Sequence, residues 1–155
     1  MPGLLIIAHA PLASALREVA RHAFPESPQY LQAFDVTPEM SPEDIQRGAS
    51  VLLCEVGNPD ALILTDVVGG TPCNISKLIA KDINGVNGKR VKVISGVNVP
   101  MVWRALGHVN DAIDVLVECA FSGATEGVRV QASTKPQNQA QKTGANDQDP
   151  SKHQQ

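Results

Sequence analysis

Two side chains suited to group transfer stand at the ends of apolar segments. His9 follows the apolar run 4–8, and Asp66 follows the predominantly apolar run 61–65. An imidazole can act as a nucleophile near neutral pH, because its unperturbed pKa is about 6.5. A carboxylate that accepts a hydrogen bond from one ring nitrogen fixes the tautomer and leaves the other nitrogen free to attack. The pair predicts a nucleophilic histidine with an orienting aspartate; a structural histidine and a turn-capping aspartate are the alternatives.

A glycine turn directly after Asp66 has the features of an anion site. Gly69 and Gly70 can bring backbone N–H groups together, and Thr71 adds a hydroxyl donor. Thr71 also opens a segment suited to the start of a helix, where the dipole favours negative charge. The turn has neither the Gly-Lys-Thr/Ser of a triphosphate loop nor the third spaced glycine of a dinucleotide fingerprint. We expect Gly69, Gly70 and Thr71 to bind an anion, with an ordinary turn as the alternative.

The three cysteines are weaker candidates. Cys73 adjoins the glycine turn, where a helix N-terminus can lower a thiol pKa, but only His9 is available to form a catalytic pair with it. Cys54 and Cys119 fall on the apolar sides of expected helices, so we expect them to be core residues. The cysteine spacings match no paired metal motif, and we expect neither a metal site nor a cofactor.

The elements that must position these residues follow from the hydrophobic pattern. Short apolar runs predict strands, and apolar residues at helical spacing predict helices. The expected strands are 4–8, 30–36, 61–65, 91–94 and a closing strand at 128–130, and the expected helices are 12–24, 41–56, 75–83, 100–106 and 113–121. This alternation predicts an α/β fold with a mostly parallel sheet.

The expected strand ends bring the candidate residues together. Ligands of parallel sheets bind beyond the carboxyl ends of the strands. His9, Asp66 and the loop 96–100 each follow such an end. We therefore expect the imidazole, the carboxylate and the glycine turn to share one crevice.

The composition changes sharply near residue 131. From 132 to 155 the only apolar residues are three alanines, and the remainder is polar, charged, Gly or Pro. Such a segment cannot bury enough surface to offset its ordering entropy. We expect a single folded domain over 1–131 and a disordered polar tail over 132–155.

The composition also excludes several classes of function. The 155 residues carry a net charge of −3, and aromatic residues make up only 3%. Nucleic-acid binding normally needs clustered positive charge or stacking aromatics, so we expect no nucleic-acid partner. No apolar run reaches the roughly 18 residues needed to span a bilayer, and no signal peptide is evident. We expect a cytoplasmic protein without membrane insertion.

Three segments together resemble the IIA component of mannose-type sugar phosphotransferase systems, the mannose/fructose/sorbose family. They are 6–9, 66–74 and 96–101, and their order and spacing match over about residues 2–130. The resemblance implies that His9 accepts a phosphoryl group from the histidine-containing phosphocarrier protein and passes it to a IIB partner. It maps the supporting carboxylate onto Asp66 and the phosphate-contacting hydroxyl onto Thr71.

The resemblance also implies an architecture. The family fold is a parallel sheet with helices on both faces, usually in a homodimer that exchanges a C-terminal edge strand. Here that strand would be 128–130, and it would cover an edge that otherwise invites pairing.

This chain departs from the family pattern around the histidine and in the glycine turn. Ala8 and Ala10-Pro11-Leu12 flank His9, and Val68 and Cys73 replace aromatics common in the turn. We expect a stand-alone form, with either a IIB component or a regulatory protein as the phosphoryl acceptor. Two alternatives stay open: a regulatory binding module switched by His9 phosphorylation, and the phosphoryl-donor subunit of a dihydroxyacetone kinase system.

Overall fold

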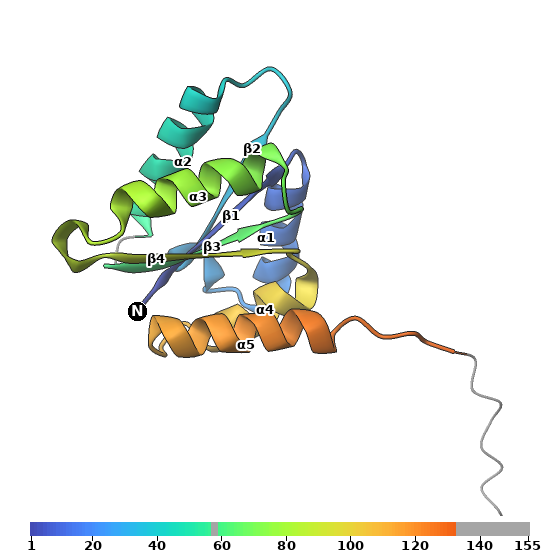
Figure 1. Ribbon diagram of the computed structural model, residues 1–155. Coiled ribbons are helices and arrows are strands. Elements are labelled where there is room, and N and C mark those ends of the chain that lie inside the picture. Colours follow the sequence, from blue (N-terminus) through green and yellow to red (C-terminus); the bar gives the residue numbers. More distant parts are fainter. Residues whose placement is uncertain (57–58, 133–155) are drawn as a thin grey trace, which may run out of the picture.

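A four-stranded parallel sheet lies between two layers of helices in the computed structural model, which describes residues 1–56 and 59–132 (Figure 1). The strands are β1 (Gly3–His9), β2 (Leu31–Val36), β3 (Asp60–Thr65) and β4 (Arg90–Ser95), in the order β2-β1-β3-β4. The helices are α1 (Leu12–Ala23), α2 (Pro42–Glu55), α3 (Thr71–Ile83), α4 (Val99–Gly107) and α5 (Ile113–Glu126), with short 3-10 turns at Ser27–Gln29 and Val86–Gly88. The predicted α/β class and parallel sheet are confirmed.

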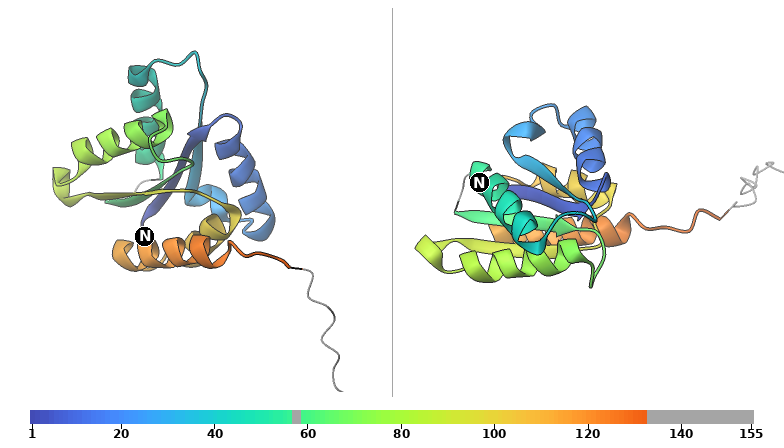
Figure 2. Two further views of the ribbon diagram at one scale, coloured as in Figure 1. Left: turned by 45° about the vertical axis from the view of Figure 1, so that its right-hand side comes forward. Right: turned by 90° about the horizontal axis from the view of Figure 1, so that it is seen from above.

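The central strands are buried on both faces, which explains their unbroken apolar runs. Along β1, Leu4 and Ile6 pack into the core formed with α1, α4 and α5. Leu5 and Ile7 alternate with them and pack into the core formed with α2 and α3. The two further directions of view in Figure 2 show the same arrangement of helices on both faces of the sheet.

Local capping signals place the helix starts. Ser41 caps α2, as expected from the sequence, because its hydroxyl accepts a hydrogen bond of 3.1 Å from the Asp44 N–H. Asn98 caps α4 in the same way through the Met101 N–H, at 2.9 Å. The Asn98 amide also donates to the Ala124 carbonyl at 3.2 Å, which ties the start of α4 to α5.

Two glycines lie at the close contact between α4 and α5. A Cβ atom at Gly123 would stand 2.6 Å from the Cβ of Arg104, and one at Gly127 would stand 2.5 Å from the Cγ of Pro100. Any larger residue at either position would push the helices apart.

The C-terminal part of the domain differs from expectation. Residues 128–130 form no strand within the single chain, and Figures 1 and 2 show this segment running away from the sheet after α5. Val128 and Val130 are 74% and 94% exposed. Pairing of this segment with a second subunit stays a prediction. The expected disordered tail lies, apart from Ala132, outside the described residues.

Two cysteines occupy positions that the helical pattern misjudged. Cys54 is exposed and Cys119 is half-buried, so the expectation that both belong to the core is wrong. Their chain neighbours Leu53 and Ala120 take the buried positions instead. Cys73, in contrast, is fully buried. Within the described residues, no helix has the length and apolar character needed to cross a membrane.

Candidate functional site

His9 and Asp66 emerge side by side at the carboxyl edge of the sheet. His9 is the last residue of β1, and Asp66 directly follows β3. These strands are hydrogen-bonded neighbours, with Ile7 opposite Thr65. The two side chains therefore meet because two central strands end together, as the sequence predicts.

A single carboxylate oxygen holds both the backbone and the ring of His9. Oδ2 of Asp66 accepts the His9 backbone N–H at 2.9 Å and lies 2.7 Å from Nδ1 of the imidazole. The other oxygen, Oδ1, accepts the Val67 N–H at 2.8 Å. The Asp66 side chain is 13% exposed and that of His9 is 54% exposed, so the carboxylate lies beneath an accessible ring.

The electrostatics of Asp66 fix the tautomer of the ring. Burial by itself would raise the pKa of Asp66. Hydrogen bonds from the His9 backbone, the His9 ring and the Val67 N–H, together with the charge of His9, outweigh burial and hold the pKa of Asp66 below its ordinary value. An ionised carboxylate only accepts hydrogen bonds, so Nδ1 carries the proton and Nε2 has the lone pair in the neutral ring.

The glycine turn packs against the imidazole. A Cβ atom at Gly70 would come within 3.1 Å of Cε1 of His9 and 3.0 Å of Cγ1 of Val67. Gly69 adopts a φ of +84°, a conformation that side chains rarely tolerate. Gly69 thus makes the turn possible, whereas Gly70 leaves room for the ring.

The backbone groups of the turn are largely engaged within the turn and α3. The Gly70 N–H bonds to the Val67 carbonyl at 3.2 Å, so this donor is not directed at a ligand in the structure. The Asn74 side-chain amide donates to the Gly69 carbonyl at 3.2 Å. Thr71 is exposed and is the first residue of α3. A 13-residue helix therefore begins, with the positive end of its dipole, next to His9.

Asp35 supports the site from β2, and the sequence reading did not identify it. Its Oδ1 accepts the Ser14 N–H at 3.0 Å, which satisfies a free donor in the first turn of α1. The Ala10 N–H bonds to the Val36 carbonyl at 2.9 Å. The turn that follows His9 is therefore held by the neighbouring strand. The position of Asp35 near the carboxyl end of the second expected strand was the sequence signal that could have identified it.

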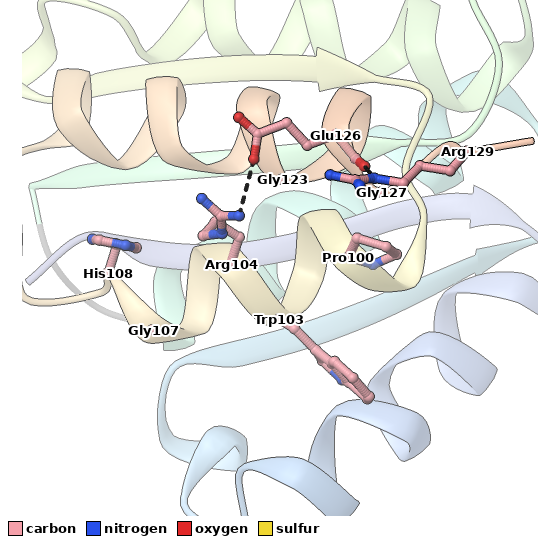
Figure 3. Close-up of a pocket in the computed structure, with 9 residues that line it drawn as sticks. All are labelled: Pro100, Trp103, Arg104, Gly107, His108, Gly123, Glu126, Gly127 and Arg129. Atoms are coloured by element: carbon pink, nitrogen blue, oxygen red, sulfur yellow. Dashed lines mark hydrogen bonds and ion pairs between the residues drawn. The ribbon is translucent and has the colours of Figure 1, made fainter. Parts of the chain in front are cut away.

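A hollow elsewhere on the molecule contains none of the predicted site residues. It measures about 420 Å³ and lies between α4 and α5. Figure 3 shows Arg104 reaching towards Glu126, to which it is paired at 3.3 Å, while Trp103 points away from Glu126. Arg129 donates to the Glu126 carbonyl at 3.0 Å. Among the described residues, no group of three or more His, Cys, Asp or Glu side chains is placed to hold a metal ion.

Comparison with known proteins relates the chain to one family. The family model described as "PTS system fructose IIA component" matches residues 3–121. A phosphotransferase system component EIIA from Streptococcus agalactiae superposes with a TM-score of 0.73 at 26% identity, covering 84% of this chain and 97% of that one. A search of the curated proteins finds no match.

Two further solved structures share the fold at lower identity. The mannose/sorbose-specific IIA subunit from Enterococcus faecalis has a TM-score of 0.73 at 22% identity, covering 86% of this chain and 97% of that one. A PTS IIA protein associated with the fucose utilization operon of Streptococcus pneumoniae has a TM-score of 0.69 at 19% identity, covering 83% and 92%.

Proposed function

Because the chain belongs to the family of PTS system fructose IIA components, we propose that His9 is the residue on which it carries a phosphoryl group. The donor is the histidine-containing phosphocarrier protein, and the acceptor is a IIB component or a regulatory protein. We place this exchange in the cytoplasm. The observation that carries the proposal is the 2.7 Å contact between Nδ1 of His9 and the Asp66 carboxylate, on an imidazole that is otherwise half exposed.

The transfer step needs little chemistry beyond positioning. The lone pair on Nε2 of His9 attacks the phosphorus of the donor's phosphohistidine in line. An N–P bond forms at His9 while the N–P bond of the donor breaks, and that electron pair returns to the donor's imidazole. Nδ1 keeps its proton and its hydrogen bond to Asp66. The phosphorylated ring is then cationic, and the carboxylate stabilises it. Passing the group onward repeats the exchange with His9 as the leaving group.

The glycine turn and α3 supply the surroundings of the transferred group. Gly70 leaves space beside Cε1 of His9, and the N-terminus of α3 favours the negative charge of the phosphoryl oxygens. Thr71 offers its hydroxyl and backbone N–H from the first position of the helix. We assign Gly69, Gly70 and Thr71 to phosphoryl binding on this basis.

The decisive test is phosphorylation in a reconstituted system. The protein is mixed with phosphoenolpyruvate, enzyme I and the histidine phosphocarrier, and its intact mass is followed. We expect one acid-labile phosphoryl group on the wild type and on a His22→Ala control, and none on His9→Ala. A phosphorylated His9→Ala variant would show that the site assignment is wrong. An unmodified wild type would refute the phosphocarrier function.

The acceptor can be identified with the phosphorylated protein itself. Loss of the group to a purified IIB component supports a transport role, and loss to a kinase subunit supports a dihydroxyacetone kinase system. A change in affinity for a regulatory protein without transfer supports the binding module. We propose the IIB or regulatory acceptor as the first to test.

We also propose that the protein works as a homodimer that exchanges the segment 128–130. The outer side of β4 has no partner strand among the described residues, and such an edge invites pairing. Val128 and Val130 are highly exposed in the single chain and have side chains that favour strands. An antiparallel pairing of this segment with β4 of a second subunit would satisfy both.

A further inference from the structure

One side chain in the first turn of α3 is hydrogen-bonded to the glycine turn. The side-chain amide of Asn74 donates to the Gly69 carbonyl at 3.2 Å, and the Asn74 backbone N–H donates to the Gly70 carbonyl at 3.0 Å. A single residue thus binds two successive carbonyls of the turn. The backbone bond is an ordinary helical one that any residue except proline could make. The other bond requires a side-chain donor at position 74.

The peptide bond between Gly69 and Gly70 is held at both of its polar groups. Its carbonyl accepts the Asn74 side-chain amide, and its N–H donates to the Val67 carbonyl at 3.2 Å. Packing around Gly69 adds little, because a Cβ atom there would meet nothing within 4 Å and the adjoining Val68 is 74% exposed. Hydrogen bonds therefore determine where this peptide bond lies.

The position of this peptide bond matters at His9, because Gly70 stands beside the ring. A Cβ atom at Gly70 would come within 3.1 Å of Cε1, the ring carbon that is bonded to both nitrogens. Asp66 restrains the ring at Nδ1, whereas the glycine turn lies beside the carbon that joins Nδ1 to Nε2. A movement of Gly70 would therefore change the space next to Nε2 while the contact with Asp66 stays in place.

We propose that Asn74 is a positioning residue for phosphoryl acceptance: its side-chain amide holds the Gly69 carbonyl and thereby keeps Gly70 beside the His9 ring. This inference rests on the proposed function of His9. The start of α3 does not depend on this amide, because Gly70 occupies the N-cap position and no side chain caps the helix. Removal of the amide should slow the transfer step and leave α3 folded.

Two substitutions separate the donor from the other properties of position 74. Asn74→Ala removes the whole amide. Asn74→Asp keeps the size and suits a helix N-terminus, but a carboxylate only accepts hydrogen bonds and cannot donate to the Gly69 carbonyl. Asn110→Ala is the matched control, because Asn110 is exposed and lies with Asp60 and Arg90 at the amino end of the sheet.

Hydrogen exchange at the Gly70 amide measures the hold in the unphosphorylated protein. Once the Gly69 carbonyl is released, the turn should open more often and the Gly70 N–H should leave the Val67 carbonyl more often. We expect exchange to be about three- to tenfold faster in Asn74→Ala and Asn74→Asp than in the wild type and Asn110→Ala, the effect of one net hydrogen bond. Thermal unfolding confirms that each variant is folded. Wild-type exchange in either variant of Asn74 would overturn the proposal.

Phosphoryl acceptance in the reconstituted system measures the consequence at His9. Asn74→Ala should lower the maximal rate about three- to tenfold and leave the half-saturating concentration of the donor unchanged. Because Asn74 is exposed, a role in contacting the donor protein would instead raise that concentration, and this result would overturn the proposal. An unchanged maximal rate would overturn it as well. A wild type that accepts no phosphoryl group would refute the function of His9 together with this positioning role, whereas the other outcomes leave the function of His9 intact.

Discussion

At the scale of single residues, Asp66 combines two tasks that the sequence suggested separately. It was expected either to cap a turn or to orient a histidine, and it does both. Oδ1 accepts the Val67 N–H, while Oδ2 accepts two N–H groups of His9. The ring is therefore tied to the same carboxylate as its own backbone, which restricts how the imidazole can turn.

Replacing Asp66 with Asn tests the orienting task. Asn can still accept hydrogen bonds, but it loses the charge and can present an N–H to Nδ1 instead. We expect phosphoryl acceptance at His9 to fall at least about tenfold without disappearing, because the wrong tautomer becomes favoured. Quenched-flow transfer from the phosphorylated donor measures the rate. An Asp66→Asn rate equal to the wild-type rate would contradict the assigned role.

The same variant also tests how the unfolding free energy depends on pH. The pKa of Asp66 lies below its ordinary value of about 3.9 in the folded state, so its carboxylate stabilises the fold at pH values above that number. The contribution is lost as the pH falls through the folded-state pKa. We expect the wild type to exceed Asp66→Asn by about 1–3 kcal/mol in unfolding free energy at pH 5. Below about pH 4 the difference in unfolding free energy between the wild type and Asp66→Asn should become smaller. Urea denaturation at a series of pH values measures it.

The sequence could indicate the candidate site residues but not the contacts that hold them. His9 and Asp66 are recognisable because each follows an apolar run. The contact of Gly70 with the imidazole joins residues 61 positions apart, and the Cys73 sulfur lies 3.2 Å from the Ser95 hydroxyl, 22 positions further along the chain. Such contacts depend on the three-dimensional path of the turn, which a pattern of residue types does not contain.

At the scale of elements, α1 begins without a cap of its own. Pro11 stands at the N-cap position and offers no side-chain hydrogen bond to the helix. Asp35 of β2 supplies the acceptor instead, at the Ser14 N–H. An acid at this place also suits the helix dipole. A side chain of β2 thus holds the start of the helix that follows His9.

Removing this cap should weaken the fold measurably. We expect Asp35→Ala to lower the unfolding free energy by about 1 kcal/mol, the usual cost of a lost helix cap. Asp35→Asn retains an acceptor and should lose less. Urea denaturation followed by circular dichroism makes the comparison. If both variants unfold at the wild-type midpoint, the hydrogen bond to Ser14 contributes nothing to stability.

The helices and strands that carry local sequence signals were predictable. Which side chains of a helix face the core was harder to predict. The start of α2 at Ser41-Pro42 is predictable from neighbouring residues alone. The strands are predictable because burial on both faces requires an unbroken apolar run. The position of Cys54 was misjudged because a helical stripe leaves an uncertainty of one residue at its margin. Leu53 is buried and the next residue is exposed. Whether a residue at the margin of the apolar stripe is buried depends on the elements that pack against the helix.

At the scale of the whole molecule, the outer edge of β4 has no partner strand within residues 1–56 and 59–132. β4 lies at one end of the sheet, and 128–130 runs away from it. Whether β4 pairs with segment 128–130 depends on a second subunit, and the sequence of one chain carries no direct information about such a subunit. The resemblance to a family supplied the expectation of exchange, and the residue pattern alone predicted only a closing strand.

Two prolines in segment 128–130 test the proposed dimer. Arg129→Pro/Val130→Pro removes consecutive backbone N–H groups and so disrupts either register of pairing. Arg129→Lys/Val130→Thr keeps those groups and is the control. By light scattering we expect dimers for the wild type and the control, and monomers for the proline variant. A proline variant that stays dimeric would place the interface elsewhere, and a monomeric wild type would remove the proposal.

The placement of His9 and Asp66 at the carboxyl ends of adjacent central strands has a consequence for durability. Their separation is set by the spacing of two hydrogen-bonded strands, about 4.8 Å, and these strands form the most protected part of the sheet. Loops that fray on heating therefore do not part the two residues. Local unfolding of the peripheral loops should therefore change the surroundings of His9 and Asp66 before it changes the alignment of the two side chains. That alignment should be lost only when the sheet itself unfolds.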